Sequence, residues 1–165
     1  MNIPPLSRME VADPNLAELE LVYGALISRV KAASTADEAI SALSSWNELR
    51  VEIETWRSLV EVRFNQHTDN AEYKKRREFC DEITPKLIEW QVAIKRLLLD
   101  GPFAGDIEQK YGPQVIALWR SDLATFEPAI ADDLVTEARL VGEFTELTGT
   151  ARFPFREETL NLSSV

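Results

Sequence analysis

The strongest constraint on the fold is an apolar face that runs along residues 80–97 at alternating spacings of three and four. Its members are Cys80, Ile83, Leu87, Trp90, Ile94 and Leu97. Residues at these spacings lie on one face of an α-helix, and such a face has to be buried against a partner. Pro85 lies inside the pattern, which continues through it in phase. We therefore expect one long helix with a kink at Pro85 and both halves helical.

Three other segments, residues 13–33, 36–66 and 127–149, repeat this helical spacing. The inward positions are predicted as Leu16, Leu19, Tyr23, Leu26 and Val30 in the first, Ile40, Leu43, Trp46, Leu49, Ile53, Trp56 and Val60 in the second, and Ile130, Leu134, Ala138, Val141, Phe144 and Leu147 in the last. In the second segment the repeat averages about 3.5 residues, which favours lengthwise packing on a partner helix.

Helix starts are marked by side chains that can accept from the first free N–H groups. Asp13 stands just before a proline, which suits the first helical position. Thr35 with Glu38, and Asp69 with Glu72, have the spacing of capping boxes. We expect a helix to begin at each of these three places.

Helix ends are marked by glycine, proline and polar residues. Residues 66–68 indicate a break, and Asp-Gly-Pro at 100–102 indicates the end of the proline-containing helix. Glycines and Tyr-Gly-Pro divide residues 103–126, which predicts two short helices there. The last long helix should begin near Glu-Pro at 127–128 and end at Gly149.

Residues 151–165 change character, because Phe153 alternates with Phe155 and Leu160 with Leu162. Alternation of this kind indicates strands or a hairpin. We therefore predict an all-α fold, an antiparallel bundle of long helices with short connecting helices and a C-terminal β-hairpin. The expected organisation is an irregular leader (1–12), a helical domain (13–150) and a strand-like tail (151–165) that leads towards an absent domain.

Composition excludes several classes of function. The formal net charge of −10, from 18 basic and 28 acidic side chains, repels phosphate backbones and anionic lipids, so we expect neither nucleic-acid nor membrane binding. No stretch approaches the roughly 20 apolar residues of a membrane span. Cys80 is the single cysteine, so no internal disulfide can form. With no signal-peptide pattern at the start, a cytoplasmic location is expected.

Histidine is the commonest side-chain zinc ligand and general base, and this sequence has only His67. It lies in a polar corner between two predicted helices, where a surface or capping role is favoured. With no histidine other than His67, we expect neither an HExxH motif nor a histidine-based triad. We therefore assign no catalytic, cofactor-binding or metal-binding residue.

Cys80 and the tryptophans lie at core positions. Cys80 belongs to the apolar face that defines the proline-containing helix, which favours a buried, unreactive thiol. Trp46, Trp56 and Trp90 also occupy core spacing in long helices, and with Trp119 they could otherwise stack a ligand. Core packing is the favoured interpretation for all four.

Two charged clusters have both a functional and a structural interpretation. Asp133 and Glu137 are one helical turn apart, which could hold a cation or support acid–base chemistry, although favourable interaction with the helix dipole explains them better. Residues 74–77, Lys-Lys-Arg-Arg, form the only basic run. The acidic residues nearest to it in sequence are Glu72, Glu78, Asp81 and Glu82. A salt-bridged, solvated face is expected rather than an anion site.

The order of segments resembles the N-terminal helical region of oligoendopeptidase F-like zinc metallopeptidases, in the thimet oligopeptidase superfamily. The stretches that carry the resemblance are SSWNELRVEIETWRSLVEVRFNQHTDNAEY, the helix that follows to IKRLLLDGPF, and LWRSDLATFEPAIADDLVTEARLVGEFTELTGTARFPFREETLNLSSV. It covers about residues 13–165. One local departure is the hairpin, where Arg156 and its neighbours stand in place of the usual glycine.

The resemblance implies a peptidase family whose chemistry needs zinc, two histidines of HExxH, the glutamate between them and a further glutamate ligand. None of these has a counterpart in this sequence, so no catalytic residue is carried over. The implied role is that of an N-terminal domain that walls one side of a peptide-binding cleft, with zinc in the absent catalytic domain. The chain would then be cut from a larger peptidase or come from a split gene.

Two further hypotheses stay open. A stand-alone helical interaction or scaffold protein that oligomerises through its apolar faces would show the same long patterns. A small enzyme that uses paired carboxylates has little support beyond Asp133 and Glu137. The expected partner is a second copy of the chain or the missing catalytic domain, and a peptide substrate is expected only in the full-length context.

The single histidine and single cysteine generate a first prediction. The purified chain should contain well below one zinc per molecule and should not cleave peptides, because it lacks the ligands of a catalytic zinc. Metal analysis after dialysis, together with a fluorogenic peptide assay, checks both. A stoichiometric zinc that survives dialysis would show this prediction to be wrong.

Overall fold

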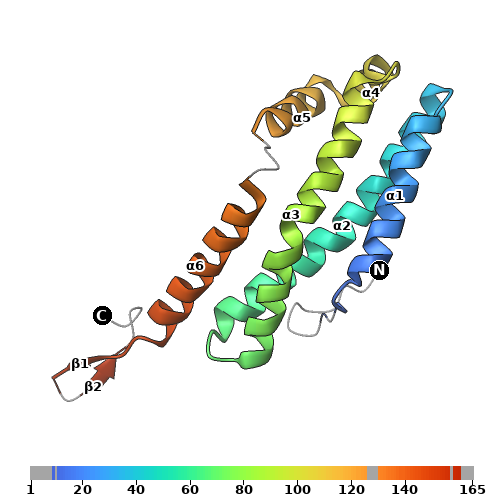
Figure 1. The fold of residues 1–165 in the computed structure, drawn as a ribbon. Helices are drawn as coiled ribbons and strands as arrows, with labels where there is room; N and C mark the ends of the chain where they lie inside the picture. Colours follow the sequence, from blue (N-terminus) through green and yellow to red (C-terminus); the bar gives the residue numbers. More distant parts are fainter. Residues whose placement is uncertain (1–8, 10, 126–129, 157, 161–165) are drawn as a thin grey trace.

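The computed structural model describes residues 9, 11–125, 130–156 and 158–160. Over these ranges six helices precede a two-stranded antiparallel sheet (Figure 1). The helices are α1 (Leu16–Ala32), α2 (Ala36–Gln66), α3 (Ala71–Asp100), α4 (Ala104–Tyr111), α5 (Pro113–Thr125) and α6 (Ala131–Thr150). The strands are β1 (Phe153–Phe155) and β2 (Glu158–Leu160). The predicted all-α fold, with two short connecting helices and a hairpin, is confirmed.

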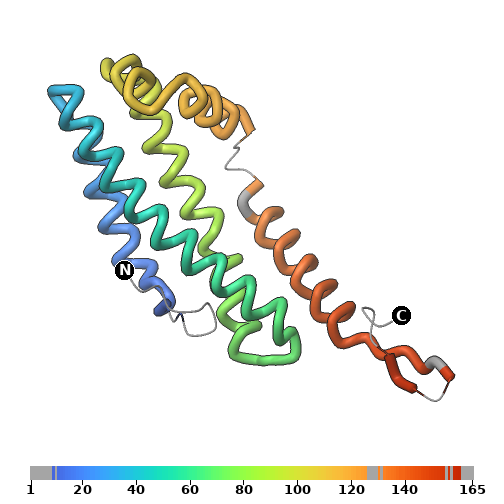
Figure 2. The backbone as a smooth tube through the Cα atoms, turned by 180° about the vertical axis from the view of Figure 1, so that it is seen from behind, coloured from blue at the N-terminus to red at the C-terminus, as the bar shows by residue number. Residues whose placement is uncertain are grey.

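α3 is the central helix of the structure. It packs on α1 and α2 and also contacts α4, α5 and α6. Figures 1 and 2 show α1, α2 and α3 side by side and alternating in direction, with α4 and α5 across one end. In both views α6 runs beside α3 on the side opposite α1. The predicted antiparallel bundle is therefore formed, with α6 as an outer helix.

The core is built from the predicted apolar faces of α1, α2 and α3, except that Leu16, predicted to point inward, is 43% exposed. Leu87 and Ile94 of α3 are 1% and 0% exposed, and Tyr23 of α1 is 0% exposed. The Tyr23 ring stacks on Trp90 with ring centroids 4.9 Å apart. All four tryptophans are at most 8% exposed, which confirms their core role. Burying each large apolar side chain stabilises the fold by about 1.5–3 kcal/mol.

Two helix starts differ from the prediction by one or two residues. Asn15 caps α1 and Asn70 caps α3, each accepting from two first-turn N–H groups at 2.9–3.3 Å. The predicted caps, Asp13 and Asp69, are wrong. Asp69 lies inside a turn that the Asn70 N–H closes by donating to the His67 carbonyl at 3.0 Å, so the helix begins one residue later.

The capping box at the start of α2 is confirmed. The Glu38 N–H donates to Thr35 Oγ1 at 3.3 Å. In return, the Glu38 carboxylate accepts from the Ser34 N–H at 2.7 Å. Because the carboxylate accepts the bond from the Ser34 N–H, the pKa of Glu38 is held below its usual value.

Asp13 has a tertiary role instead of a capping role. Its Oδ1 accepts from Trp56 Nε1 at 2.9 Å and from Arg76 Nε at 2.8 Å. Arg76 also donates to the Val11 carbonyl at 2.8 Å, and Arg63 donates to the Met9 carbonyl. The described part of the leader is therefore tied to α2 and α3 although it has no helix or strand of its own.

Pro85 lies inside one continuous helix, because α3 runs unbroken from Ala71 to Asp100. The missing N–H leaves the Asp81 carbonyl without its helical donor. Thr84, the residue before Pro85, donates from its Oγ1 to the Cys80 carbonyl at 2.7 Å. The single helix is confirmed, and the kink itself stays a prediction.

α3 ends where the sequence indicates, but for a steric reason. Gly101 has an ordinary φ of −78°. A Cβ at this position would lie 2.7 Å from the Leu97 carbonyl oxygen, so the close backbone approach requires glycine. Gly112 separates α4 from α5 and adopts φ 89°, which favours glycine directly.

The predicted inward face of α6 is wrong for four of its six residues, whereas Leu134 and Ala138 are half-buried on the side towards α3. Val141, Phe144 and Leu147 are 51%, 66% and 67% exposed, and Ile130 is 39% exposed. The side towards α3 carries Leu134 and then smaller or polar residues, Val135, Ala138, Gly142 and Glu146. The helix ends at Thr150, one residue after the predicted end. Its predicted start at 127–128 lies outside the described residues.

The hairpin pairs Phe153 with Leu160 and Phe155 with Glu158. Arg156 adopts φ 57°, so the turn uses a left-handed conformation that favours glycine. The predicted hairpin is confirmed over its described residues, and Leu162 lies outside them.

The two adjacent candidates for the cap of α3 give a matched test. Asn70→Ala should lower the free energy of unfolding by about 1 kcal/mol, because two first-turn N–H groups lose their acceptor. Asp69→Ala should change it by less than about 0.5 kcal/mol. Urea unfolding of both variants measures the difference, and an equal loss in both would contradict the assignment of Asn70.

Candidate functional site

The sequence candidates for metal binding do not come together. Among the described residues, no three His, Cys, Asp or Glu side chains are grouped so as to hold a metal ion. The His67 side chain is exposed, and the residue caps the end of α2. Its backbone N–H donates to the Arg63 and Phe64 carbonyls at 3.1 Å. This is the capping role that the sequence favours for it.

Cys80 lies in the core between the helices and is 5% exposed. Burial raises the pKa of its thiol, and the nearby Arg57 opposes that rise. The thiol therefore stays protonated and shielded at neutral pH, as a structural residue would.

The basic run at residues 74–77 is salt-bridged, but mostly to segments other than its own. Arg76 pairs with Asp13 at 2.7 Å, and Lys74 pairs with Glu146 of α6 at 2.5 Å. Arg77 pairs with Asp81 at 2.9 Å and with Glu61 of α2 at 3.7 Å. Of the four acidic partners expected from sequence, the structure gives an ion pair to Asp81. The run ties the leader, α2 and α6 to α3 and is not a fully solvated face.

A cavity of about 380 Å³ separates α3 from α6. Its lining combines apolar residues with charged ones, Phe64, Lys74, Arg77, Glu78, Asp81, Glu82, Val135, Ala138, Arg139, Gly142 and Glu143. A Cβ on Gly142 would meet no atom within 4 Å, so α6 does not press closely on α3 there. Burial raises the pKa of Asp81 although Arg77 opposes the rise. The inner contact of α6 is therefore polar and incompletely filled.

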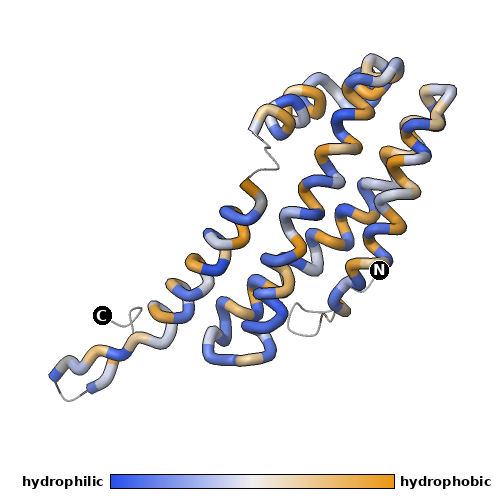
Figure 3. Tube along the Cα trace, in the orientation of Figure 1, coloured by the Kyte–Doolittle hydropathy of each residue, from blue (hydrophilic) through white to orange (hydrophobic). Residues whose placement is uncertain are grey.

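The opposite side of α6 carries large apolar residues that the other described elements leave exposed. We define the outer face of α6 as Leu140, Val141, Phe144 and Leu147, which are 51–67% exposed. Figure 3 shows apolar residues recurring along this helix between polar ones. Clustered large apolar residues on a protein surface mark interaction sites.

Asp133 and Glu137 border the outer face. Together with Thr136, Leu140, Val141 and Phe144 they line a shallow hollow of about 450 Å³. Both carboxylates are exposed, and neither forms an ion pair with a residue that the structure describes. Their place beside an apolar surface suits the rim of an interface better than a catalytic pair.

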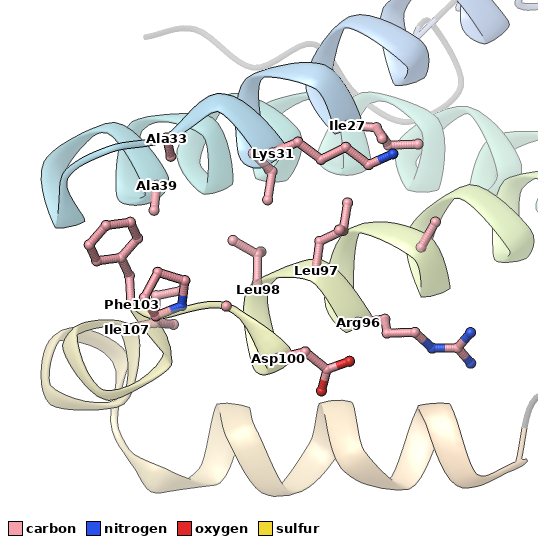
Figure 4. A pocket seen from close by; sticks show the side chains of 14 residues that line it. Ile27, Lys31, Ala33, Ala39, Arg96, Leu97, Leu98, Asp100, Phe103 and Ile107 are labelled. Carbon is pink, nitrogen blue, oxygen red and sulfur yellow. The ribbon is translucent and has the colours of Figure 1, made fainter.

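A second hollow of about 550 Å³ lies between the ends of α1 and α3 and the start of α4. Figure 4 shows Leu97, Leu98 and Phe103 pointing into this space, whereas the charged ends of Arg96 and Asp100 lie on the far side of α3. No histidine, cysteine or serine lines it. It can accommodate an apolar group, and it offers no nucleophile paired with a base.

A family model of the peptidase M3 N-terminal domain matches residues 6–126. The chain belongs to this family. The match covers α1 to α5, so α6 and the hairpin lie beyond it. No curated protein matches the sequence.

Solved structures of peptidases resemble the whole described fold of this M3 N-terminal domain. PZ peptidase A with an inhibitor gives a TM-score of 0.93 at 29% identity over 96% of this chain. A protein assigned as oligoendopeptidase F gives 0.92 at 30% identity over 96%. A protein from Bacillus anthracis with the same assignment gives 0.91 at 29% over 95%. The chain spans 28–29% of the length of these three proteins.

Two features of this domain were missed at the level of sequence. Sequence spacing predicts Val141, Phe144 and Leu147 of the outer face of α6 as core residues, because apolar periodicity does not say which partner covers a face. The tertiary role of Asp13 was missed because an aspartate before Pro14 also suits a cap. Asp13 and Asn15 are both residue types that commonly cap helices, and they lie within three positions of each other. The start of the helix is therefore ambiguous in the sequence.

The burial of Cys80 predicts that its thiol reacts slowly in the folded protein. In the folded protein, Cys80 should react with a soluble disulfide reagent at least about 100-fold more slowly than in guanidinium chloride, because reaction requires opening of the core. Absorbance of the released thiolate measures both rates. Similar rates in the two conditions would contradict the structural role of Cys80.

Proposed function

We propose that this chain acts as the non-catalytic N-terminal domain of an oligoendopeptidase F-like zinc peptidase, where it forms one wall of the peptide-binding cleft. The observation that carries the proposal is the family match over residues 6–126. The likeness to PZ peptidase A and to two proteins assigned as oligoendopeptidase F, over 95–96% of the chain, supports it.

The proposal assigns zinc to the remainder of such a peptidase and not to this chain. The described residues do not fit a zinc site, because His67 is exposed at the end of α2 while Cys80 is buried in the core. Asp133 and Glu137 offer two carboxylates on one helix without a third ligand. No catalytic step is derived for these residues.

The bundle is suited to the role of a wall. Its three long helices share one aromatic core, in which Tyr23, Trp46, Trp56 and Trp90 are at most 7% exposed. Close packing of this kind resists deformation, and a rigid surface can hold a peptide near a catalytic centre supplied by another part of the protein. Peptide binding is thus proposed only for the complete peptidase.

A cytoplasmic location without nucleic-acid or membrane partners is part of the same proposal. The net charge of −10 supports it, because that charge opposes binding to polyanions. Separately, none of the helices in the described ranges combines the length and apolarity needed to cross a lipid bilayer.

The second candidate function is a stand-alone scaffold protein that oligomerises. The apolar faces of α2 and α3 do not favour it, because Trp56, Leu87 and Ile94 on these faces are buried within the chain itself. Its remaining support is the outer face of α6, which a second copy could cover. This candidate predicts a homodimer of the isolated chain.

A hybrid protein tests the proposed function. In it, the present chain replaces the matching region of the Bacillus anthracis protein assigned as oligoendopeptidase F. The hybrid should bind zinc and cleave a fluorogenic peptide, whereas the isolated chain should do neither. A hybrid whose HExxH glutamate is changed to glutamine is the matched inactive control, because it keeps both zinc-binding histidines.

Two outcomes would contradict the proposed function. One is peptide cleavage by the isolated chain above the rate of the buffer. The other is a hybrid that folds and binds zinc but cleaves no peptide, which would show that this domain cannot complete the cleft.

A further inference from the structure

The two faces of α6 differ in exposure, and four of its large apolar residues, Leu140, Val141, Phe144 and Leu147, are more than half exposed. Towards α3 the helix presents Leu134, Ala138, Gly142 and Glu146, with an ion pair from Glu146 to Lys74 and a cavity beside Ala138 and Gly142. Away from α3 it presents Phe144 and Leu147, each about two-thirds exposed. A helix with its strongest apolar stripe outward is stabilised chiefly by a partner on that side.

We propose that the outer face of α6 is a docking surface for the catalytic portion of an oligoendopeptidase chain, which receives it in an apolar groove with basic residues along one edge. This inference rests on the proposed function. It adds which surface of the domain contacts the catalytic portion and which kinds of side chain form that contact. The occupant is thus a single partner of stated character: apolar at its centre and cationic at its rim.

The relatives support this choice of occupant. Each of the three solved structures aligns with 95–96% of this chain, an extent that includes α6, while the chain spans only 28–29% of each. The larger part of each relative therefore lies outside the matched region. The family model, in turn, stops at residue 126, before α6 begins. α6 is thus the described helix that follows the segment matched by the family model.

The charges beside the outer face specify the rim of the partner. Asp133 and Glu137 share the hollow with Leu140, Val141 and Phe144 and have no ion pair with a described residue. Opposite charges on a partner would satisfy them, and complementary rim charges mainly set specificity. A second copy, which also carries a net charge of −10, meets this requirement less well.

The hybrid described above tests the surface with a matched pair of variants. Phe144→Glu places a charge in the outer face, and Leu21→Glu places one on α1 at a residue that is 74% exposed. In the isolated chain both substitutions should shift the melting temperature by less than about 2 °C, because both side chains are solvated there. Any unequal effect in the hybrid then reports the interface and not the fold of this domain.

Amide hydrogen exchange across residues 140–147 is the readout in the hybrid. Exchange should be at least about tenfold slower in the hybrid than in the isolated chain, because docking opposes local opening of α6. Phe144→Glu should abolish that protection, and Leu21→Glu should keep it. Glu137→Lys should reduce protection partly, since it reverses one rim charge.

The outcomes separate the docking surface from the function on which it rests. If the hybrid cleaves peptide and Phe144→Glu keeps as much protection as Leu21→Glu, the docking surface is overturned while the proposed function stands. If α6 is protected but the folded hybrid is inactive, the surface stands and the proposed function is overturned. Sedimentation of the isolated chain tests whether a second copy occupies the outer face. A dimer that Phe144→Glu dissociates would assign the face to a second copy and overturn the proposal.

Discussion

The apolar face of α3 is the constraint on which the rest of the structure depends. α1, α2, α4, α5 and α6 all contact this helix. Its inward residues include Leu87, which is 1% exposed, and Trp90, whose ring stacks on Tyr23 at 4.9 Å. Since removal of one such buried side chain costs several kcal/mol, the position of α3 determines where every other helix can lie. Even Pro85 is accommodated inside it, because the energy of burial exceeds that of one lost helical hydrogen bond.

Polar contacts at the start of α3 add order to this apolar framework. Three side chains within four residues, Lys74, Arg76 and Arg77, hold α6, the leader and α2, respectively. Exposed ion pairs contribute about 0–1 kcal/mol each, so they orient these segments more than they stabilise them. The bond from Trp56 Nε1 to Asp13 differs, because it satisfies a donor on a residue that is 2% exposed.

α6 belongs to the bundle only in part. It contacts α3 through Leu134 and through small and charged residues around a cavity, whereas the four residues of its outer face are exposed. This unequal distribution connects the fold to the proposed function, because a domain that walls a cleft has to be held by the rest of the peptidase. The M3 N-terminal domain is therefore interpreted as a rigid bundle with one helix adapted to a neighbouring part of the protein.

The sequence by itself determined the helices, the core and the absence of a second histidine. Apolar spacing identified Leu87 and Ile94, and local side-chain chemistry identified the Thr35 cap, because both depend on residues within one or two turns. Only the tertiary structure decided between Asp13 and Asn15 as a cap, since the choice depends on Arg76, 63 residues away. It also decided the orientation of α6. Periodicity shows that a helix has an apolar face, but which neighbour covers Phe144 depends on how the whole chain packs.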